Sequence, residues 1–437
     1  MKTSMNGNLS IFHNFLLDHG EVRFVRFQWQ DHSGILRGRI LPVSQALEID
    51  GGKRALSIGP VAFQFTLGNA FLPDIDARGK DVLIPDWTSL YTRPGLDFKY
   101  ATVMCEIVEY TPARPAPNWN FCPRHALNKM VQKVQSQLQV DLLIGFEVEF
   151  IIMKREEGGE VIPHSKSMGA FSVAGYRDPL FAHVEEVIGV LEGAGIRIDT
   201  IQSEGVQGQY EISLLPLPPM QAIDQLLVVQ DTLKAVFMRH GLIATMAPRP
   251  IPGLSSSNGQ HAHISLNPPT KEEQFLAGIL KRLPQLLALC LPYELSYERV
   301  SEYCAGTAVA WGTENRAVPI RKIKAGHWEL RFIDASANMY LALAALLGAG
   351  LTGCKNDETL AWQDTAFDES QSPSDGVMFP KEIDDAINQL EGAVEDLDAV
   401  LETHVIKHFV YVKKFEIAML REKYETSKLR GMMSEIF

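Results

Sequence analysis

The stretch Gly145-Phe-Glu-Val-Glu-Phe150 carries two glutamates two positions apart among apolar residues. Successive side chains of a β-strand point to opposite faces, so Glu147 and Glu149 share one face and their apolar neighbours share the other. The spacing therefore predicts a strand with one buried apolar face and one face that presents carboxylates.

Two further stretches repeat this spacing, namely His261-Ala-His263-Ile-Ser265 and Glu329-Leu-Arg331. In a fourth stretch, Glu204 and Glu211 flank a turn that contains glycine. Clustered carboxylates repel one another and need cations to stay ionised. We therefore expect the four stretches to form a sheet whose polar face is a site rather than a solvated surface.

The candidate metal ligands are rich in oxygen and poor in nitrogen. They are five carboxylates with one or two imidazoles: Glu147, Glu149, Glu204, Glu211, Glu329, His261 and His263. Such donors favour Mg²⁺ or Mn²⁺. One octahedral ion usually takes fewer protein ligands than this. We therefore expect two or three ions, as at sites of phosphoryl transfer. The alternative is that each glutamate faces solvent and that each histidine is an ordinary core residue.

Four arginines follow in the same part of the chain: Arg299, Arg316, Arg321 and Arg331. The planar guanidinium matches carboxylate and phosphate groups, and Arg331 shares a strand face with Glu329. A solvated basic surface is the alternative for this group. The sequence has no Walker P-loop and no Gly-x-Gly-x-x-Gly behind a strand, so ATP, if used, would be held by metal ions and arginines.

The composition is that of an ordinary globular protein of 437 residues, 46% of them hydrophobic and 22% charged. The formal net charge of −12 argues against a general surface for nucleic acid or for an anionic membrane. Five scattered cysteines without C-x-x-C spacing favour a reduced, cytoplasmic setting. The N-terminus lacks the apolar core of a signal peptide, and the longest apolar stretch, Met339 to Leu351, is too short to span a bilayer.

Hydrophobic periodicity predicts helices that alternate with short strands. Helices are expected at 11–20, 123–138, 179–195, 218–240, 271–290, 337–350 and from 381 onward. Strands are expected at 22–30, 36–41, 61–66, 82–84, 101–109, 142–153, 198–203, 260–266, 307–313, 317–323 and 327–333. A Ser-, Asp- and Gly-rich surface loop is expected at 363–378. This order favours an α+β fold with the sheet curled toward a partial barrel.

Prolines at positions 112, 115 and 117 mark a boundary in the chain. Residues 1–113 before it are expected to form a small mixed sheet, and residues 114–437 after it carry all of the candidate site residues. We therefore expect two domains that meet close to residue 113.

Five ordered motifs resemble those of the glutamine synthetase superfamily. They are Gly145-Phe-Glu-Val-Glu-Phe150, Gly208-Gln-Tyr-Glu-Ile212, Asn258-Gly-Gln-His-Ala-His-Ile-Ser-Leu266, Asn315-Arg-Ala-Val-Pro-Ile-Arg321 and Glu329-Leu-Arg-Phe-Ile-Asp-Ala-Ser-Ala-Asn338. The resemblance spans nearly the whole chain, from about residue 20. It implies a β-grasp domain at 1–113 and a catalytic domain at 114–437 with a curved antiparallel sheet, the bifunnel, surrounded by helices. It also implies homo-oligomers of stacked rings, usually of twelve subunits, with active sites between neighbours.

The resemblance also implies roles for individual residues. Ligands of a first metal ion would be Glu149, Glu204 and Glu211, and ligands of a second would be Glu147, His261 and Glu329. Arg316 resembles the arginine that stabilises phosphoryl transfer, and Arg299 and Arg331 resemble those that hold the amino-acid carboxylate and the acyl phosphate. The contacts to ATP would be Arg321, His263 and Ser265. The implied reaction joins a carboxylic acid, glutamate or an analogue, to a nitrogen nucleophile through an acyl phosphate made from ATP.

Two departures from the family pattern concern the nitrogen nucleophile. Family members that use ammonia hold ammonium with two acids, one of them in a stretch that corresponds to Glu302-Tyr-Cys-Ala-Gly-Thr307. Here Cys304 or Ala305 occupies its place, and Glu302 is an imperfect substitute. The second acid belongs to a segment that corresponds to Arg54-Ala-Leu-Ser-Ile58, which contains none. Because a desolvated cation needs a charged or aromatic partner, a larger amine held through its apolar body fits better than ammonium.

A third departure concerns the acid substrate. The family loop Asn-Gly-Ser-Gly reads Ser256-Ser-Asn-Gly259 here, so that Ser257 replaces a glycine in the loop that contacts the amino group of glutamate. The acid need not be glutamate itself. The sequence thus favours an amine ligase of the γ-glutamyl-amine branch. The competing interpretations are a true glutamine synthetase, a catalytically inactive structural relative, and a metal-dependent hydrolase, which the four arginines argue against.

Overall fold

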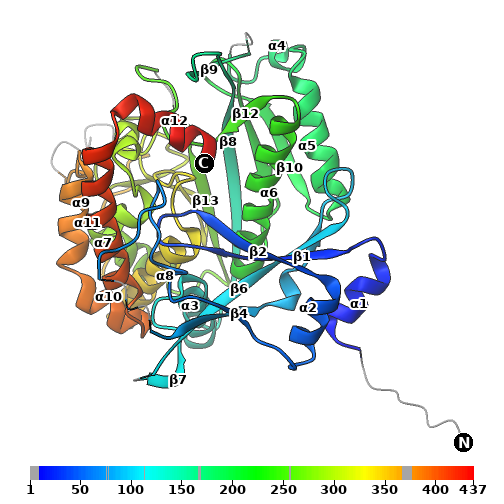
Figure 1. The fold of residues 1–437 in the computed structure, drawn as a ribbon. Coiled ribbons are helices and arrows are strands. Elements are labelled where there is room, and N and C mark those ends of the chain that lie inside the picture. Colours follow the sequence, from blue (N-terminus) through cyan, green and yellow to red (C-terminus); the bar gives the residue numbers. More distant parts are fainter. Residues whose placement is uncertain are drawn as a thin grey trace, which may run out of the picture.

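Two β-sheets form the framework of the protein (Figure 1). The structure, a computed structural model, describes residues 9–74, 76, 78–112, 114–165, 169–254, 257–366 and 376–437. The first sheet comes from the N-terminal part of the chain, and the second comes from residues after 140. The mixture of helices and largely antiparallel strands confirms the α+β class expected from the sequence.

The first sheet has seven strands in the order β2-β1-β6-β4-β3, with β5 and β7 also paired to β6. Their bounds are β1 Phe24–Gln30, β2 Leu36–Pro42, β3 Leu56–Ile58, β4 Lys80–Pro85, β5 Tyr91–Thr92, β6 Tyr100–Thr111 and β7 Arg114–Asn118. Strands β1 and β6 are parallel, and the other pairs are antiparallel. Helices α1 Ile11–Asp18 and α2 Val43–Asp50 contribute Phe12 and Ala46 to the small core of this sheet.

The second sheet has nine strands in the order β10-β11-β8-β13-β16-β15-β14, with β9 and β12 paired to β8. Their bounds are β8 Asp141–Arg155, β9 Val161–Pro163, β10 Ile198–Ser203, β11 Gln209–Leu214, β12 Leu242–Thr245, β13 Gln260–Asn267, β14 Trp311–Thr313, β15 Ile320–Lys324 and β16 His327–Leu330. All pairs are antiparallel except β14–β15. The apolar alternate residues of β8, among them Phe146 and Val148, are buried in the main core, as period-two spacing predicts.

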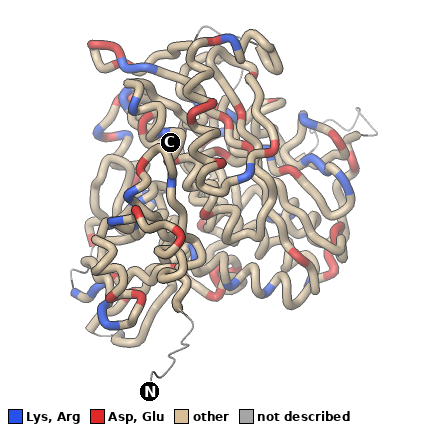
Figure 2. Tube along the Cα trace, turned by 90° about the vertical axis from the view of Figure 1, so that its right-hand side faces the viewer, with Lys and Arg blue, Asp and Glu red and all other residues tan. Residues whose placement is uncertain are grey.

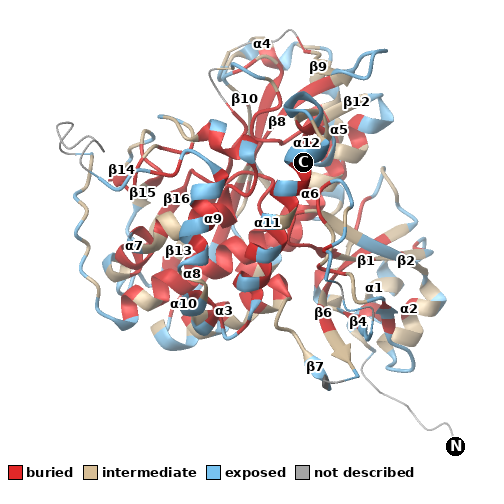
Figure 3. Cartoon of the chain, turned by 60° about the vertical axis from the view of Figure 1, so that its left-hand side comes forward, coloured by how far each residue is buried: buried red, intermediate tan, exposed pale blue. Residues whose placement is uncertain are grey.

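Helices cover this second sheet. Their bounds are α3 Pro123–Leu138, α4 Val173–Tyr176, α5 Phe181–Gly193, α6 Pro219–Arg239, α7 Glu272–Cys290, α8 Met339–Lys355, α9 Ile383–Glu391, α10 Val394–Leu401, α11 Val405–Lys423 and α12 Thr426–Ile436. Figure 3 shows buried residues concentrated along the central strands and the inner helix faces. Helix α8 is buried over almost its whole length. Its N-cap residue is Asn338, whose side chain accepts a hydrogen bond from the Leu341 amide. Among the described residues, no helix has the length and apolar character needed to cross a bilayer.

Some expected elements differ from the structure. Residues 61–66 form turns rather than a strand, and the edge of the sheet is formed instead by β3 at Leu56–Ile58. Here the Trp29 indole donates to the Ala62 carbonyl, and the Asp81 carboxylate accepts from the Ala62 amide, so these backbone groups are satisfied without a strand partner. Strand β16 ends at Leu330, and most of the expected loop 363–378 lies outside the described residues.

The first sheet continues past residue 113, where the sequence places the domain boundary. Strand β7 at Arg114–Asn118 pairs with β6 and so belongs to the first sheet. Division of the chain at residue 113, and the β-grasp assignment of the N-terminal part, stay predictions. On the side of the molecule shown in Figure 2, acidic and basic residues are interspersed along the chain.

Candidate active site

Strand register brings the predicted metal ligands to one place. Glu147 and Glu149 lie on the central strand β8. On one side Glu211 of β11 pairs with Glu149, and on the other His261 of β13 pairs with Glu147. Strand β16 follows β13 and carries Glu329. Four neighbouring strands therefore align five of these side chains across one face, because each strand presents alternate residues to that face.

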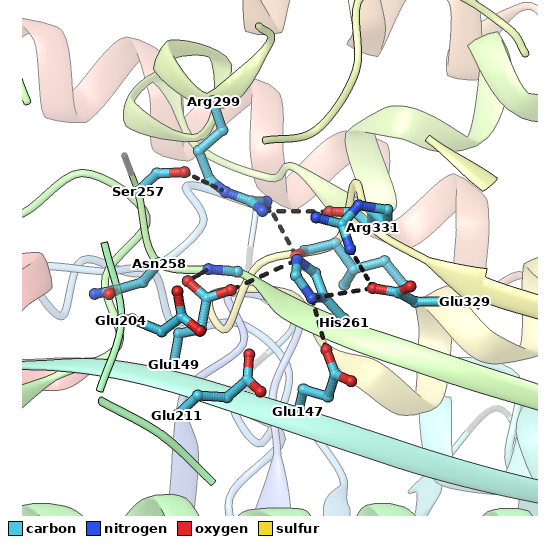
Figure 4. A network of polar contacts seen from close by, with 12 residues as sticks. Glu147, Glu149, Glu204, Glu211, Ser257, Asn258, His261, Arg299, Glu329 and Arg331 are labelled. Atoms are coloured by element: carbon cyan, nitrogen blue, oxygen red, sulfur yellow. Dashed lines mark hydrogen bonds and ion pairs between the residues drawn. The ribbon is translucent and has the colours of Figure 1, made fainter. Parts of the chain in front are cut away.

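A cavity of about 500 Å³ opens on this face of the sheet. All six ligands predicted for the two metal ions line it (Figure 4): Glu147, Glu149, Glu204, Glu211, His261 and Glu329. The arginines predicted for substrate and nucleotide line it as well: Arg299, Arg316, Arg321 and Arg331. The expected convergence of carboxylates and guanidinium groups is thus present in the fold.

His261 lies at the centre of the cluster. Its Nδ1 is 2.9 Å from Glu147 Oε2 and 3.4 Å from Glu329 Oε1, and its Nε2 is 3.6 Å from Glu149 Oε1. In Figure 4, Glu149, Glu204 and Glu211 lie together on one side of His261. The carboxylates predicted for the first ion and those predicted for the second ion thus lie on either side of the His261 imidazole.

Neutral amides donate to the three carboxylates predicted for the first metal ion, Glu149, Glu204 and Glu211. Gln202 Nε2 donates to Glu204 Oε1 at 2.7 Å and to Glu211 Oε1 at 3.1 Å. Gln209 Nε2 donates to Glu149 Oε2 at 3.1 Å, and the Gly259 amide donates to the same oxygen at 3.0 Å. These bonds fix each carboxylate while leaving other lone pairs for a cation.

The pKa values divide the carboxylates into two kinds. Burial alone would raise the pKa of Glu147, but hydrogen bonds from His261 and His263 outweigh burial and hold that pKa well below its usual range. Burial also opposes the ionisation of Glu329, yet His261 and Arg331 lower its pKa. These two carboxylates are charged because neighbouring cations or hydrogen-bond donors compensate them.

For Glu204 and Glu211, burial and neighbouring negative charges outweigh the hydrogen bonds that these carboxylates accept. Burial, followed by the charges of Glu147, Glu149 and Glu204, raises the pKa of Glu211 to about 9. Burial and Glu149 also raise the pKa of Glu204. A divalent cation would supply the missing positive charge, and oxygen donors with one imidazole suit Mg²⁺ or Mn²⁺. The donor set therefore fits the expected ions.

Geometry also groups these side chains into candidate metal sites. One oxygen or nitrogen from each of Glu147, Glu211 and His261 lies within 4.8 Å of the others, and the same holds for Glu147, His263 and Glu329. Both groups contain Glu147, whereas the sequence assigns Glu211 and His261 to different ions. The assignment of particular ligands to particular ions therefore stays a prediction.

Two arginines share the carboxylate of Glu329. Arg321 Nη1 donates to Glu329 Oε2 at 2.9 Å, and Arg331 Nη1 donates to Oε1. Arg321 also donates to Glu314 through Nε at 3.0 Å. Arg316, in the turn before β15, is exposed at the cavity wall. Its guanidinium group is therefore accessible to a substrate in the cavity.

Arg299 is buried and bound to protein acceptors. Its guanidinium group donates to the carbonyls of Phe332 at 3.2 Å and Ile333 at 3.0 Å, and its Nε donates to Ser257 Oγ at 3.2 Å. Its exposed fraction is only 1%. The hydroxyl of Ser257 thus positions Arg299, a contact that a glycine at 257 could not make.

The two residues predicted to contact ATP from β13 lie farther along that strand. His263 Nε2 is 3.1 Å from Glu147 Oε1, and its Nδ1 is 3.0 Å from His327 Nε2. Ser265 pairs with His327 across the strands and is half-buried. Neither residue is among those that line the 500 Å³ cavity, so their predicted contact with ATP stays a prediction.

Several residues of the cavity wall were not predicted from the sequence. Thr200 and Gln202 precede Glu204 at steps of two, and Ser213 follows Glu211 by two, so the period-two spacing that found the glutamates also marks these residues. Phe171 and Tyr303 come from loops and both have positive φ, 57° and 64°. Only the tertiary fold brings these loops to the cavity, so periodicity could not have found them.

A curved sheet with carboxylates, an imidazole and arginines around one cavity is the arrangement of an enzyme that handles phosphates with divalent ions. The family described as glutamine synthetase, catalytic domain, matches residues 120–432 of this chain. The chain therefore belongs to the glutamine synthetase family, whose members are ATP-dependent ligases that form C–N bonds.

The chain is similar to several characterised proteins. It is 31% identical over 441 residues to protein FluG of Emericella nidulans, covering 97% of this chain and 50% of FluG, so it spans about half the length of that relative. It is 27% identical to glutamine synthetase of Halobacterium salinarum, over 91% of this chain and 90% of the relative. It is 28% identical to gamma-glutamylpolyamine synthetase GlnA3 of Streptomyces coelicolor, over 78% of this chain and 77% of the relative.

A solved structure shares the fold. The structure described as apo GmaS without ligand superposes with a TM-score of 0.79 at 22% identity, covering 95% of this chain and 97% of the other. The family match and this structural likeness together confirm the glutamine synthetase type of fold expected from the motifs.

Proposed function

We propose that this protein is an ATP-dependent ligase that joins a carboxylic acid to an amine through an acyl phosphate. The observation that carries the proposal is the convergence of five glutamates, His261 and four arginines on one cavity. In this reaction an oxygen of the acid attacks the γ-phosphorus of ATP, and ADP leaves. The amine nitrogen then attacks the acyl carbon, phosphate leaves, and the nitrogen loses a proton.

Each group of side chains has a proposed part in this chemistry. Two or three Mg²⁺ or Mn²⁺ ions, held by the six metal ligands named above, would neutralise phosphate charge. Arg316 is exposed at the cavity wall and would stabilise the charge of the transferred phosphoryl group. Arg331 would contact the acyl phosphate, and Arg299, fixed by backbone carbonyls, would present its edge to the substrate carboxylate.

An amine as nucleophile is supported by what the cavity wall lacks. Among the described residues, the carboxylates that line the cavity are the five proposed metal ligands, and Glu302 is not one of the lining residues. The wall next to it is formed by Tyr303 and Cys304. Ammonium would therefore meet no free acid at this position, whereas an amine with an apolar body would contact the aromatic ring.

A second aromatic residue lies at the same cavity. Phe171 is 70% exposed, and Tyr303 is also 70% exposed, although both line the cavity. The Phe171 amide donates to the Ser203 carbonyl at 2.9 Å, which holds this residue beside Glu204. Two aromatic rings at one cavity, the Phe171 ring on a backbone held in this way, suit recognition of an organic amine.

The acid substrate is proposed to be glutamate or an analogue. Ser257 binds Arg299 at 3.2 Å and lies in the cavity wall, so its hydroxyl narrows the space available to the acid. The similarity to GlnA3, a gamma-glutamylpolyamine synthetase, supports glutamate as the donor of a γ-glutamyl group.

Phosphate release from ATP tests this proposal. The purified protein is incubated with Mg²⁺ or Mn²⁺, glutamate, and separately ammonium, ethanolamine, putrescine or an aromatic amine. We expect release with an organic amine and little with ammonium. The second candidate function is that of a true glutamine synthetase, which the similarity to the Halobacterium enzyme favours. Phosphate release with ammonium alone would reject the amine ligase in favour of this second candidate. No release with any pair would favour an inactive relative or another acid.

Arg316→Ala provides the matching variant. We expect phosphate release to fall about a thousandfold, because removal of an arginine that stabilises phosphoryl transfer has an effect of this order. Arg177→Ala is the control, since Arg177 is also exposed but does not line the cavity. An unchanged rate in Arg316→Ala would remove its proposed role.

Assembly and location are proposed on the family resemblance. We expect a homo-oligomer of stacked rings with active sites between subunits, located in the cytoplasm and working on small molecules rather than on nucleic acid or membranes. Light scattering on the purified protein measures the number of subunits directly.

A further inference from the structure

We propose that His183, Glu186 and His240 form a second metal site that takes a transition-metal ion such as Zn²⁺ or Co²⁺. His183 and Glu186 belong to α5, and His240 directly follows α6. One ligand atom from each residue lies within 4.8 Å of the other two. None of the three lines the catalytic cavity.

Helix geometry places these side chains together. His183 and Glu186 are three residues apart, so they lie on the same face of α5. His240 Nε2 is 2.7 Å from Glu186 Oε2, and the ring of His240 stacks on that of His183 with centroids 3.9 Å apart. The His183 ring also meets the buried Phe237 edge-on at 6.0 Å. Packing between α5 and α6 therefore holds the ligands together before any ion binds (Figure 1).

The three side chains offer complementary ligand atoms. The two imidazoles supply nitrogen donors, and Glu186 supplies a carboxylate whose negative charge favours a divalent cation.

The donor set distinguishes this site from the catalytic cavity. Two imidazoles and one carboxylate match ions that prefer nitrogen, such as Zn²⁺ and Co²⁺, with water in the remaining positions. The cavity instead presents five carboxylates, which suit Mg²⁺ and Mn²⁺. The two sites should therefore select different ions from one solution.

Arg239 connects the proposed site to the N-terminal part of the chain. It donates to Glu186 Oε1 at 3.2 Å and to the Gly95 carbonyl at 3.1 Å. A metal ion on Glu186 Oε2 leaves Oε1 to this arginine. Through Arg239, a bound metal ion would then stabilise the packing of α5, α6 and the loop at residues 95–96 against one another.

Cobalt binding tests the proposal on the full-length protein. Millimolar Mg²⁺ is kept present to occupy the carboxylate cavity, and Co²⁺ bound at equilibrium is counted while its visible absorption bands are recorded. We expect one Co²⁺ per chain that Mg²⁺ does not displace. His183→Ala and His240→Ala should each lose that equivalent and its absorption bands.

The control is His19→Ala. His19 Nδ1 lies 3.8 Å from Glu21 Oε1, so it is also a histidine beside a carboxylate, but it has no place in a group of three ligands among the described residues. This variant should keep the full Co²⁺ count. Equal Co²⁺ binding by the wild type and His183→Ala, or complete displacement by Mg²⁺, would overturn the proposal. Because the readout is metal bound and not turnover, failure of the proposed ligase activity would leave this result unaffected.

Discussion

At the scale of single residues, Gly259 shows how closely the site is packed. A Cβ added there would lie 2.6 Å from His261 Nε2 and 3.0 Å from Arg299 Nη2. The Gly259 amide also donates to Glu149 Oε2 at 3.0 Å. One small residue thus allows a metal ligand and a substrate arginine to approach the same backbone position.

Gly259→Ala should reduce phosphate release about a hundredfold, because a displacement of the order of 1 Å in an active site costs that much. The added methyl group must push His261 or Arg299 away. Gly158→Ala is the control, since its Cβ would meet nothing within 4 Å. Full activity of Gly259→Ala would mean that neither side chain needs its present position.

Glu211 gives the metal-free protein a dependence on pH. Its pKa rises from 4.5 to about 9 on folding. The folded protein therefore binds more protons than the unfolded chain between these pH values, and stability falls as pH rises through the window. Bound Mn²⁺ should remove this loss of stability at high pH, because the ion compensates the charge of the Glu211 carboxylate.

Chemical unfolding of metal-free wild type and Glu211→Gln across pH 4.5 to 9 measures this effect. As the pH rises, the free energy of unfolding of the wild type should fall by more than about 1 kcal/mol relative to that of the variant. One unit of pKa shift corresponds to roughly 1.4 kcal/mol. A pH-independent difference between the two proteins would show that Glu211 is ionised without metal.

At the scale of elements, glycines permit the close packing of α7 and α8. A Cβ on Gly278 would lie 2.3 Å from the Ala349 carbonyl oxygen and 2.8 Å from Gly353 Cα. These are backbone atoms, which cannot rotate away as a flexible side chain can. The helices that support the curved sheet therefore approach one another only because these positions lack side chains.

Gly278→Ala should lower the free energy of unfolding by about 1–3 kcal/mol, because the methyl group overpacks a backbone contact. Gly189→Ala on α5 is the control, since its Cβ would meet nothing within 4 Å. That change should raise the free energy of unfolding by roughly 0.5–1 kcal/mol through helix propensity. Urea denaturation measures both, and stabilisation of both variants would contradict the packing.

Strands with one polar and one apolar face were the elements that the sequence predicted best. Strands β8 and β13 and the ligands on them follow from period-two spacing, because a buried face and a site face demand opposite residue types. The expected strand at 61–66 is wrong because the backbone of Ala62 bonds to the side chains of Trp29 and Asp81, and the amides of Gln64 and Thr66 bond within local turns. Phe171 and Tyr303 depend on left-handed loop residues, which periodicity does not report.

At the scale of the whole molecule, a buried polar network joins the N-terminal sheet to the helical part. Lys413 Nζ donates to Glu416 Oε2 at 2.6 Å, and Ser33 Oγ donates to Glu416 Oε1 at 2.7 Å. The Tyr293 hydroxyl donates to the Ser33 carbonyl at 2.7 Å. Both members of the ion pair have no exposed surface, so their geometry fixes how the turn after β1 sits against α11.

The proposed activity requires the whole fold to bring the scattered glutamates to one set of cations beside a nucleotide. X-ray diffraction from crystals soaked with Mn²⁺ and ADP tests it most directly, because manganese gives an anomalous signal. We predict two or more anomalous peaks among Glu147, Glu149, Glu204, Glu211, His261 and Glu329, with ADP phosphate oxygens in contact with them. If these side chains lie apart and no manganese lies between them, the result contradicts the proposed metal-dependent ligase site.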